Sequence, residues 1–268
     1  EEDDILKVWD RSREICRGAA NESDPKDAGR LRAKQTIAAV EQLARCDSRH
    51  ATTVDVWDTN TWLFNTPHGT IDLLTANTRD HAASDYITKT STVGFSGSCP
   101  LWLEFLDRIT ASNSQLSSYL QRVAGYCLTG STAEHALFFL YGTGANGKST
   151  FTKTLLGIWG DYGRTAPSET FMESKQERHP CDLAMLRGAR LVVASEVESN
   201  ARWAESRIKD LTGGDEISAR FMRQDYFQYT PQFKLLICGN HKPSLRSVDE
   251  AIRRRMNLVP FTVKIGRA

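Results

Sequence analysis

The sequence predicts an α/β fold, in which a mainly parallel sheet covered by helices follows a smaller, mostly helical domain with a β-hairpin. Apolar runs of strand length alternate with helical segments in the second half of the chain, which is the pattern of parallel sheets. One of these runs leads directly into a glycine-rich stretch at residues 142–149. The first half has helical periodicity and one hairpin pattern instead.

Length and composition indicate a folded protein without a membrane segment. The 268 residues, of which 40% are hydrophobic and 25% charged, suffice for one large or two modest cores. No apolar run approaches the roughly 20 residues of a membrane span, and the acidic residues 1–4 are unlike a signal peptide. We therefore expect a cytoplasmic protein with no membrane partner. The six cysteines include no CxxC pair, so we expect reduced thiols and no zinc site.

The first part of the chain predicts a small helical domain. Pro67 and Gly69 form a turn between two short strand patterns, which predicts the hairpin. Residues 111–114 are small and polar, so we place the boundary there, with residues 1–112 as the first domain and 113–268 as the second. The helical segments before and just after this boundary are residues 5–17, 27–45, 101–109 and 116–127.

Charge is distributed unevenly along the chain. The net charge is only +1, which argues against a generally basic surface. Residues 201–268, however, contain 13 Lys and Arg against 7 Asp and Glu. This basic region would suit a phosphate backbone or an ordinary solvated face, and charge alone leaves the two interpretations equal.

The glycine-rich stretch fits the phosphate-binding pattern GxxxxGK[ST] at every fixed position. An apolar run at 137–141 precedes it and a helical segment at 150–158 follows, which is the context that the pattern requires. Glycines let backbone N–H groups approach phosphates, the lysine adds a positive charge, and the serine hydroxyl suits Mg²⁺. The sequence therefore predicts a site for ATP and Mg²⁺. Its residues are Gly142, Thr143, Gly144, Ala145, Asn146, Gly147, Lys148, Ser149 and the following Thr150.

Polar side chains follow two later strand patterns, at the strand ends where ligands of parallel sheets bind. Glu196 follows the apolar run at 190–194, and we expect it to activate water and to help to hold Mg²⁺. Glu198 would share this face only if the strand stays extended. Asn240 follows the run at 233–238, where an amide could contact both the attacking water and the terminal phosphate. A simple turn is the alternative for Asn240.

Three consecutive arginines end a short helical segment. An arginine that completes the phosphate site of a neighbouring subunit must project from the subunit edge, and consecutive helical residues point about 100° apart. Not all three can therefore act in this way. We favour Arg254 and Arg255 over Arg253, and a solvated basic helix end is the alternative.

The order of these motifs resembles that of superfamily 3 helicases, which are AAA+ ATPases. The chain is similar over most of its length to the C-terminal helicase module of phage and plasmid primase-helicases. The resemblance rests on the phosphate loop with Phe151 and on four further stretches. These are residues 65–73, 125–132, 211–215 and 254–255.

The resemblance implies a homo-oligomeric ring, expected to be a hexamer, that binds ATP between subunits and single-stranded DNA in its channel. It matches Lys209 to a basic residue ahead of a DNA-contacting hairpin. Residues 217–219 and 226–229 independently read as two short strands around a basic tip, where Arg220 and Arg223 would contact DNA phosphates. Contact of Lys209 or Arg220 with the terminal phosphate of the nucleotide is the alternative. The resemblance assigns Lys148, Ser149, Glu196, Asn240 and the arginines as loop lysine, Mg²⁺ ligand, catalytic acid, sensor and trans finger. It further implies an upstream primase domain in a longer protein and an origin in a mobile element, in bacterial or host cytosol.

One departure from the family and two other functions remain open. Many relatives have two adjacent acids where this chain has Ser195 and Glu196, which leaves the Mg²⁺ ligands incomplete. A small-molecule kinase would share Lys148 and Ser149 but would need neither Asn240 nor the basic hairpin. A nucleotide-gated DNA-binding module would bind both ligands without turnover.

Overall fold

The computed structural model describes residues 7–47, 52–95, 97–173, 181–194, 202–240 and 250–265. The chain forms two compact units, residues 1–56 and 57–268. The boundary predicted near residue 112 therefore lies inside the second unit. No helix in the described ranges has both the length and the apolar character needed to cross a membrane.

The first unit is helical, as predicted. It contains α1 (Lys7–Asn21), α2 (Pro25–Leu31), α3 (Lys34–Cys46) and the short 3₁₀ turn η1 (Val54–Val56). Cys16 and Ala20 of α1 and Ile37 of α3 are buried, and the two helices pack together. The single helix predicted at 27–45 is divided in two. Thr36 caps the break, because its hydroxyl donates to the Arg30 carbonyl at 2.6 Å.

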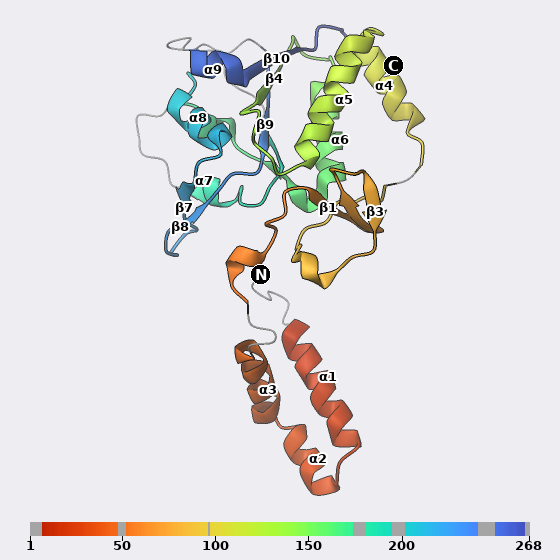
Figure 1. Ribbon diagram of the computed structural model, residues 1–268, viewed down its shortest axis with the longest axis vertical. Helices are drawn as coiled ribbons and strands as arrows, with labels where there is room; N and C mark the ends of the chain where they lie inside the picture. Colours follow the sequence, from red (N-terminus) through yellow and green to blue (C-terminus); the bar gives the residue numbers. More distant parts are fainter. Residues whose placement is uncertain are drawn as a thin grey trace. The chain divides into compact units, whose positions relative to one another are not determined.

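The second unit contains a five-stranded parallel sheet, and the predicted α/β fold class is confirmed (Figure 1). Its spatial order is β10-β4-β9-β6-β5, and every neighbouring pair is parallel. The strands are β4 (Leu137–Tyr141), β5 (Gly163–Thr165), β6 (Leu191–Ala194), β9 (Lys234–Gly239) and β10 (Met256–Pro260). Since all five run the same way, their carboxyl ends meet at one edge of the sheet.

Helices cover both faces of this sheet (Figure 1). Alternate strand residues enter two separate cores, as a strand buried on both faces requires. One core holds side chains of α4 (Pro100–Ile109), α5 (Ser114–Leu128) and α6 (Lys148–Trp159). The other holds side chains of α7 (Cys181–Ala184), α8 (Glu205–Gly213) and α9 (Glu250–Arg255).

Two small antiparallel sheets complete the second unit. The predicted hairpin near residue 67 is present as β1 (Leu63–Thr66) and β2 (Gly69–Asp72), extended by β3 (Asn77–Arg79). The predicted basic hairpin is present as β7 (Ile217–Ala219) and β8 (Phe227–Tyr229). Short 3₁₀ turns occur at η2 (Ala83–Asp85), η3 (Gly160–Tyr162) and η4 (Ser168–Phe171).

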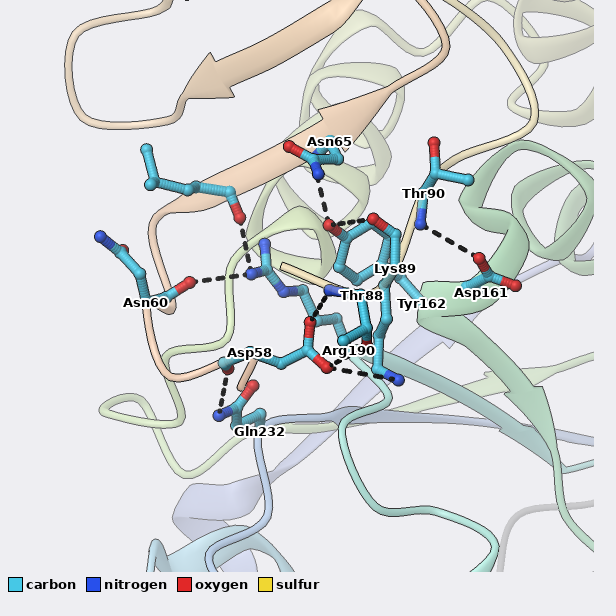
Figure 2. A network of polar contacts seen from close by, with 11 residues as sticks. Asp58, Asn60, Asn65, Thr88, Lys89, Thr90, Asp161, Tyr162, Arg190 and Gln232 are labelled. Carbon is cyan, nitrogen blue, oxygen red and sulfur yellow. Dashed lines mark hydrogen bonds and ion pairs between the residues drawn. The ribbon is translucent and has the colours of Figure 1, made fainter. Parts of the chain in front are cut away.

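Arg190 is buried at the amino-terminal edge of the large sheet (Figure 2). Its guanidinium donates to the carbonyls of Leu128 at 2.7 Å, Leu63 at 2.7 Å and Asn60 at 3.1 Å. It also lies 4.7 Å from the ring centroid of Tyr162, whose hydroxyl accepts the Asn65 N–H at 3.0 Å. One cation thus fixes both the β1 hairpin and the end of α5 to the start of β6.

Lys234 lies next to Arg190. The backbone N–H of Lys234 donates to the Arg190 carbonyl at 2.9 Å. Its ammonium reaches the Thr129 carbonyl and lies 3.3 Å from the Ser131 and Gln232 carbonyls. Burial lowers the pKa of Lys234 to about 7. This side chain ties the segment after α5 to β9, as Arg190 ties it to β6.

The pKa of Lys234 predicts a pH dependence of stability. An unfolded lysine keeps its proton up to a pKa of about 10.4, whereas folded Lys234 loses it at about 7. Between these values the unfolded chain binds more protons, so the unfolding free energy contributed by this group rises with pH. Between pH 7 and pH 9, the free energy of unfolding of wild type, measured with urea, should rise by about 2 kcal/mol more than that of Lys234→Met. Lys153→Met, at an exposed position of α6, is the control and should follow the pH dependence of wild type. Equal pH dependence of the unfolding free energy in wild type and Lys234→Met would contradict the prediction.

Candidate nucleotide-binding site

The phosphate-binding loop joins β4 to α6 and has an unusual backbone. Four of its residues have positive φ, at 152° for Gly142, 47° for Gly144, 51° for Ala145 and 87° for Gly147. Successive left-handed residues turn backbone N–H groups toward one side, which makes a concave site for an anion. The twelve-residue helix α6 begins at Lys148, so its free N–H groups add to the same surface.

Gly142 is required by a close backbone contact. A Cβ at this position would lie 1.9 Å from the carbonyl oxygen of Phe261, which follows β10. The same oxygen accepts a hydrogen bond from Asn146 Nδ2 at 2.6 Å. Further along, the Ile265 N–H donates to the Ala145 carbonyl at 2.7 Å. Residues 261–265 therefore brace the outer side of the loop.

Lys148 is held inside the loop. Its side chain is 7% exposed, and Nζ donates to the Gly142 carbonyl at 2.5 Å and to Asn146 Oδ1 at 3.0 Å. Burial lowers the pKa of Lys148, which means that its charge is incompletely compensated by these neutral acceptors. The nearby Cys238 thiol is no counter-charge, because burial raises its pKa to about 11. An anionic ligand would supply the missing compensation.

The residues present fit a nucleoside triphosphate with Mg²⁺. Ser149 and Thr150 are exposed on the first turn of α6, where a hydroxyl can serve as an oxygen ligand for Mg²⁺. The loop N–H groups and Lys148 suit phosphate oxygens. No cluster of three or more His, Cys, Asp or Glu side chains occurs among the described residues.

The strand ends place Asn240 beside this loop. Asn240 is exposed directly after β9, whose last residue Gly239 pairs with Tyr141 of β4. β6 ends at Ala194, opposite Ile237 of β9. Glu196, Ser195 and Glu198 lie outside the described residues, so their predicted roles remain predictions.

The arginines of α9 differ in their surroundings. Arg255 is 9% exposed, and its guanidinium donates to Thr212 Oγ1 of α8 at 3.2 Å and to the Ala251 carbonyl at 2.9 Å. Arg253 and Arg254 are exposed. The geometry separates the two arginines that the sequence favoured, since Arg255 is bound within its own subunit and Arg254 is accessible.

The β7–β8 hairpin combines aromatic and basic side chains. The Arg220 guanidinium lies 4.8 Å from the Tyr226 ring centroid, and Arg223 is exposed at the turn with φ of 61°. Phe221 stacks on Phe227 with centroids 5.7 Å apart; Phe221 is exposed and Phe227 is partly buried. Lys209 lies apart from this tip, on α8, and is half-buried.

Sequence reasoning missed several residues that shape the loop. Phe261 and Ile265 reach it through backbone bonds, which no side-chain motif reveals. Phe105 and Ile109 of α4 pack against Gly147. Their apolar stripe was a signal for a buried helix face, but it did not indicate which element they would meet.

Two protein families match different parts of the chain. Residues 2–111 match the family described as D5 N terminal like, and residues 140–255 match a family of unknown function. The phosphate loop lies in the second match, while α4 lies in the first.

Viral proteins are among the relatives. "Putative helicase L207/L206" of Acanthamoeba polyphaga mimivirus is 29% identical over 60% of this chain and 17% of its own length. "Putative helicase 184R" of Invertebrate iridescent virus 6 is 26% identical over 77% of this chain and 23% of its own length. The chain thus spans about a fifth of each of these relatives. Among solved structures, the NrS-1 C-terminal region matches 63% of this chain and 39% of its own chain, with a TM-score of 0.50 and 11% identity.

The chain is therefore similar to one part of longer viral proteins that are named putative helicases. The likeness to the NrS-1 region concerns the fold, and it agrees with the predicted α/β sheet covered by helices. The phosphate loop lies between β4 and α6, at the carboxyl edge of this sheet.

The backbone contact at Gly142 predicts a selective loss of nucleotide binding. In Gly142→Ala the new methyl group would meet the Phe261 carbonyl, and the loop would shift at a cost of roughly 1–3 kcal/mol. We expect ATP binding, measured by calorimetry, to weaken about 5- to 150-fold, since each 1.4 kcal/mol corresponds to a factor of ten. Gly157→Ala, on α6, is the control, because nothing lies within 4 Å of the Cβ that it would add. Wild-type affinity in Gly142→Ala would show that the loop does not depend on this contact.

Proposed function

We propose that the module is an ATP-dependent DNA helicase of superfamily 3 that acts in phage- or plasmid-type replication. It hydrolyses ATP at subunit interfaces and moves along single-stranded DNA. The observation that carries the proposal is the loop geometry: a buried Lys148 inside a left-handed backbone turn, next to the strand end that bears Asn240. The helicase names of the viral relatives and the matched families give independent support.

The loop binds the triphosphate by positioning and charge. Its N–H groups and those at the α6 amino terminus donate hydrogen bonds to the phosphate oxygens, and Lys148 shifts from its loop acceptors to the phosphate chain. The Ser149 hydroxyl and the Glu196 carboxylate are the groups of this chain that would hold Mg²⁺. When bound, Mg²⁺ would neutralise charge on the terminal phosphates.

Hydrolysis needs a group that activates water. Glu196, two residues beyond the end of β6, takes the proton of the attacking water, as a carboxylate at this strand end can do. Asn240 orients this water with its amide and contacts the terminal phosphate. The parallel register of β6, β9 and β4 supports this grouping, since their ends share one edge.

The exposed arginine of α9 completes the site of the adjacent subunit. Arg254 is the arginine that we assign to this role, because Arg255 is committed to α8. Its charge stabilises the developing charge on the terminal phosphate. Hydrolysis of ATP thereby requires a homo-oligomer, which we take to be a hexamer.

The β7–β8 hairpin contacts the strand of DNA. Arg223 and Arg220 offer charges to phosphates, and Tyr226, which is 62% exposed, offers a face for a base. Lys209 adds a charge on α8, before the hairpin. A primase domain upstream in a longer protein, a mobile-element origin and a cytosolic location belong to the same proposal.

The Glu196 assignment predicts a defect in turnover without a defect in binding. Glu196→Gln keeps shape and hydrogen bonding but removes the base, so DNA-stimulated ATP hydrolysis should fall about 10²- to 10⁴-fold. Phosphate release with and without single-stranded DNA measures this, and calorimetry should show retained ATP binding.

Glu198→Gln is the matched control and should hydrolyse ATP normally. Turnover in Glu196→Gln at the wild-type rate would remove Glu196 from this role. Transfer of phosphate to a small acceptor by wild type would indicate a kinase instead, and tight binding of ATP and DNA without turnover would indicate a binding module.

The Arg254 assignment predicts complementation between subunits. Arg254→Ala should reduce hydrolysis about 10³-fold or more, while Arg253→Ala, its exposed neighbour, should not. Mixing Arg254→Ala with Lys148→Ala subunits should restore part of the activity, because some interfaces then combine an intact loop with an intact arginine. A mixture no more active than its components would contradict action in trans.

A further inference from the structure

We propose that the base of the bound nucleotide stacks on an aromatic surface of α4 formed by Trp102 and Phe105. The proposal rests on the proposed binding of a nucleoside triphosphate by the loop. It adds a base-binding subsite that lies outside the phosphate-binding residues and within the region matched by the D5 N terminal like family.

α4 reaches the loop at Gly147, the residue before Lys148. A Cβ on Gly147 would lie 2.6 Å from Ile109 Cγ2 and 3.2 Å from Phe105 Cε2. Ile265 Cδ1 would lie 3.2 Å away, on the segment that braces the loop. The helix is therefore in direct contact with the phosphate-binding backbone.

The aromatic side chains of α4 continue from this contact along the first turn of α6. Trp102 stacks on Phe105 with centroids 5.2 Å apart and an interplanar angle of 30°. It also stacks on Phe151 of α6 at 5.7 Å and 17°. Phe151 is fully buried beneath this layer, whereas Trp102 and Phe105 remain partly exposed. The layer thus has a packed inner side and a solvent-accessible outer part.

The faces of α4 are chemically distinct. Trp102, Phe105 and Ile109 are three and four residues apart, so they share one face of the helix. Glu104 and Arg108, which are exposed, share another. The surface beside the loop is therefore aromatic and uncharged, as a nucleobase requires.

The direction of a bound nucleotide leads its base to this surface. The terminal phosphate belongs with Lys148 and the ends of β9 and β6, because those carry Asn240 and the predicted Glu196. The rest of the nucleotide then leaves by the exposed Ser149 and Thr150, on the first turn of α6. α4 packs against that turn through the contact between Trp102 and Phe151.

Stacking on these rings would discriminate weakly between bases. Every base has a π face, and neither Phe105 nor the face of Trp102 presents hydrogen-bond groups that read a base edge. We therefore expect ATP and GTP to bind with affinities within about tenfold of each other.

The test compares ATP with inorganic tripolyphosphate, which lacks the base. Loss of base stacking should weaken ATP binding to Trp102→Leu about 5- to 150-fold. Tripolyphosphate binding should stay unchanged, and Trp102→Phe should retain most of the affinity for ATP. Leu101→Ala, on the adjacent residue that is 80% exposed, is the control and should behave as wild type. Calorimetry at constant Mg²⁺ measures all of these affinities.

Tryptophan emission gives a second readout that requires only wild type and Trp102→Phe. ATP should change the emission of wild type, tripolyphosphate should not, and the change should vanish in Trp102→Phe. The proposal is overturned if Trp102→Leu binds ATP as wild type does or loses both ligands equally, or if the emission change persists in Trp102→Phe. Lys148→Ala tests the loop separately, since it should weaken the binding of both ATP and tripolyphosphate. Unchanged binding of both ligands to Lys148→Ala would refute the nucleotide site itself.

Discussion

The second unit depends on two buried basic side chains at the amino-terminal edge of its sheet. Arg190, just before β6, and Lys234, at the start of β9, donate hydrogen bonds to backbone carbonyls of the β1 hairpin and of the segment after α5. Removing either would leave several buried acceptors without donors, which is among the costly changes in a protein core. Because this edge is fixed by polar bonds in addition to apolar packing, the opposite edge can hold irregular, glycine-rich structure.

The nucleotide-binding loop is shaped by segments far from it in sequence. Residues 261–265 bind its outer side through the Phe261 and Ile265 backbones, and α4 packs on Gly147. These contacts come from beyond the family match at 140–255 on both sides. A left-handed backbone costs free energy unless its surroundings determine it, and both segments serve that purpose here.

Much of this arrangement was predictable, because the signals were local. The phosphate loop, the strand ends with Asn240 and the β7–β8 hairpin each follow from a contiguous pattern. The edge strand β5 was not predicted, since Gly163–Thr165 has no apolar run and gains its pairing only from β6. The burial of Arg255 was not predicted either. A run of three arginines does not indicate which one bonds to a residue of another helix, as Arg255 does to Thr212. The loop brace at Ile265 depends on tertiary backbone contacts that leave no mark in the sequence.

Arg255 links α9 to α8, and α8 ends at Gly213, just before β7 begins at Ile217. The exposed end of α9 and the basic hairpin are consequently connected through α8, by the side-chain bond of Arg255 and by the short segment that leads from α8 to β7. The three-arginine sequence therefore combines an anchor inside the fold, Arg255, with an exposed side chain directly before it, Arg254.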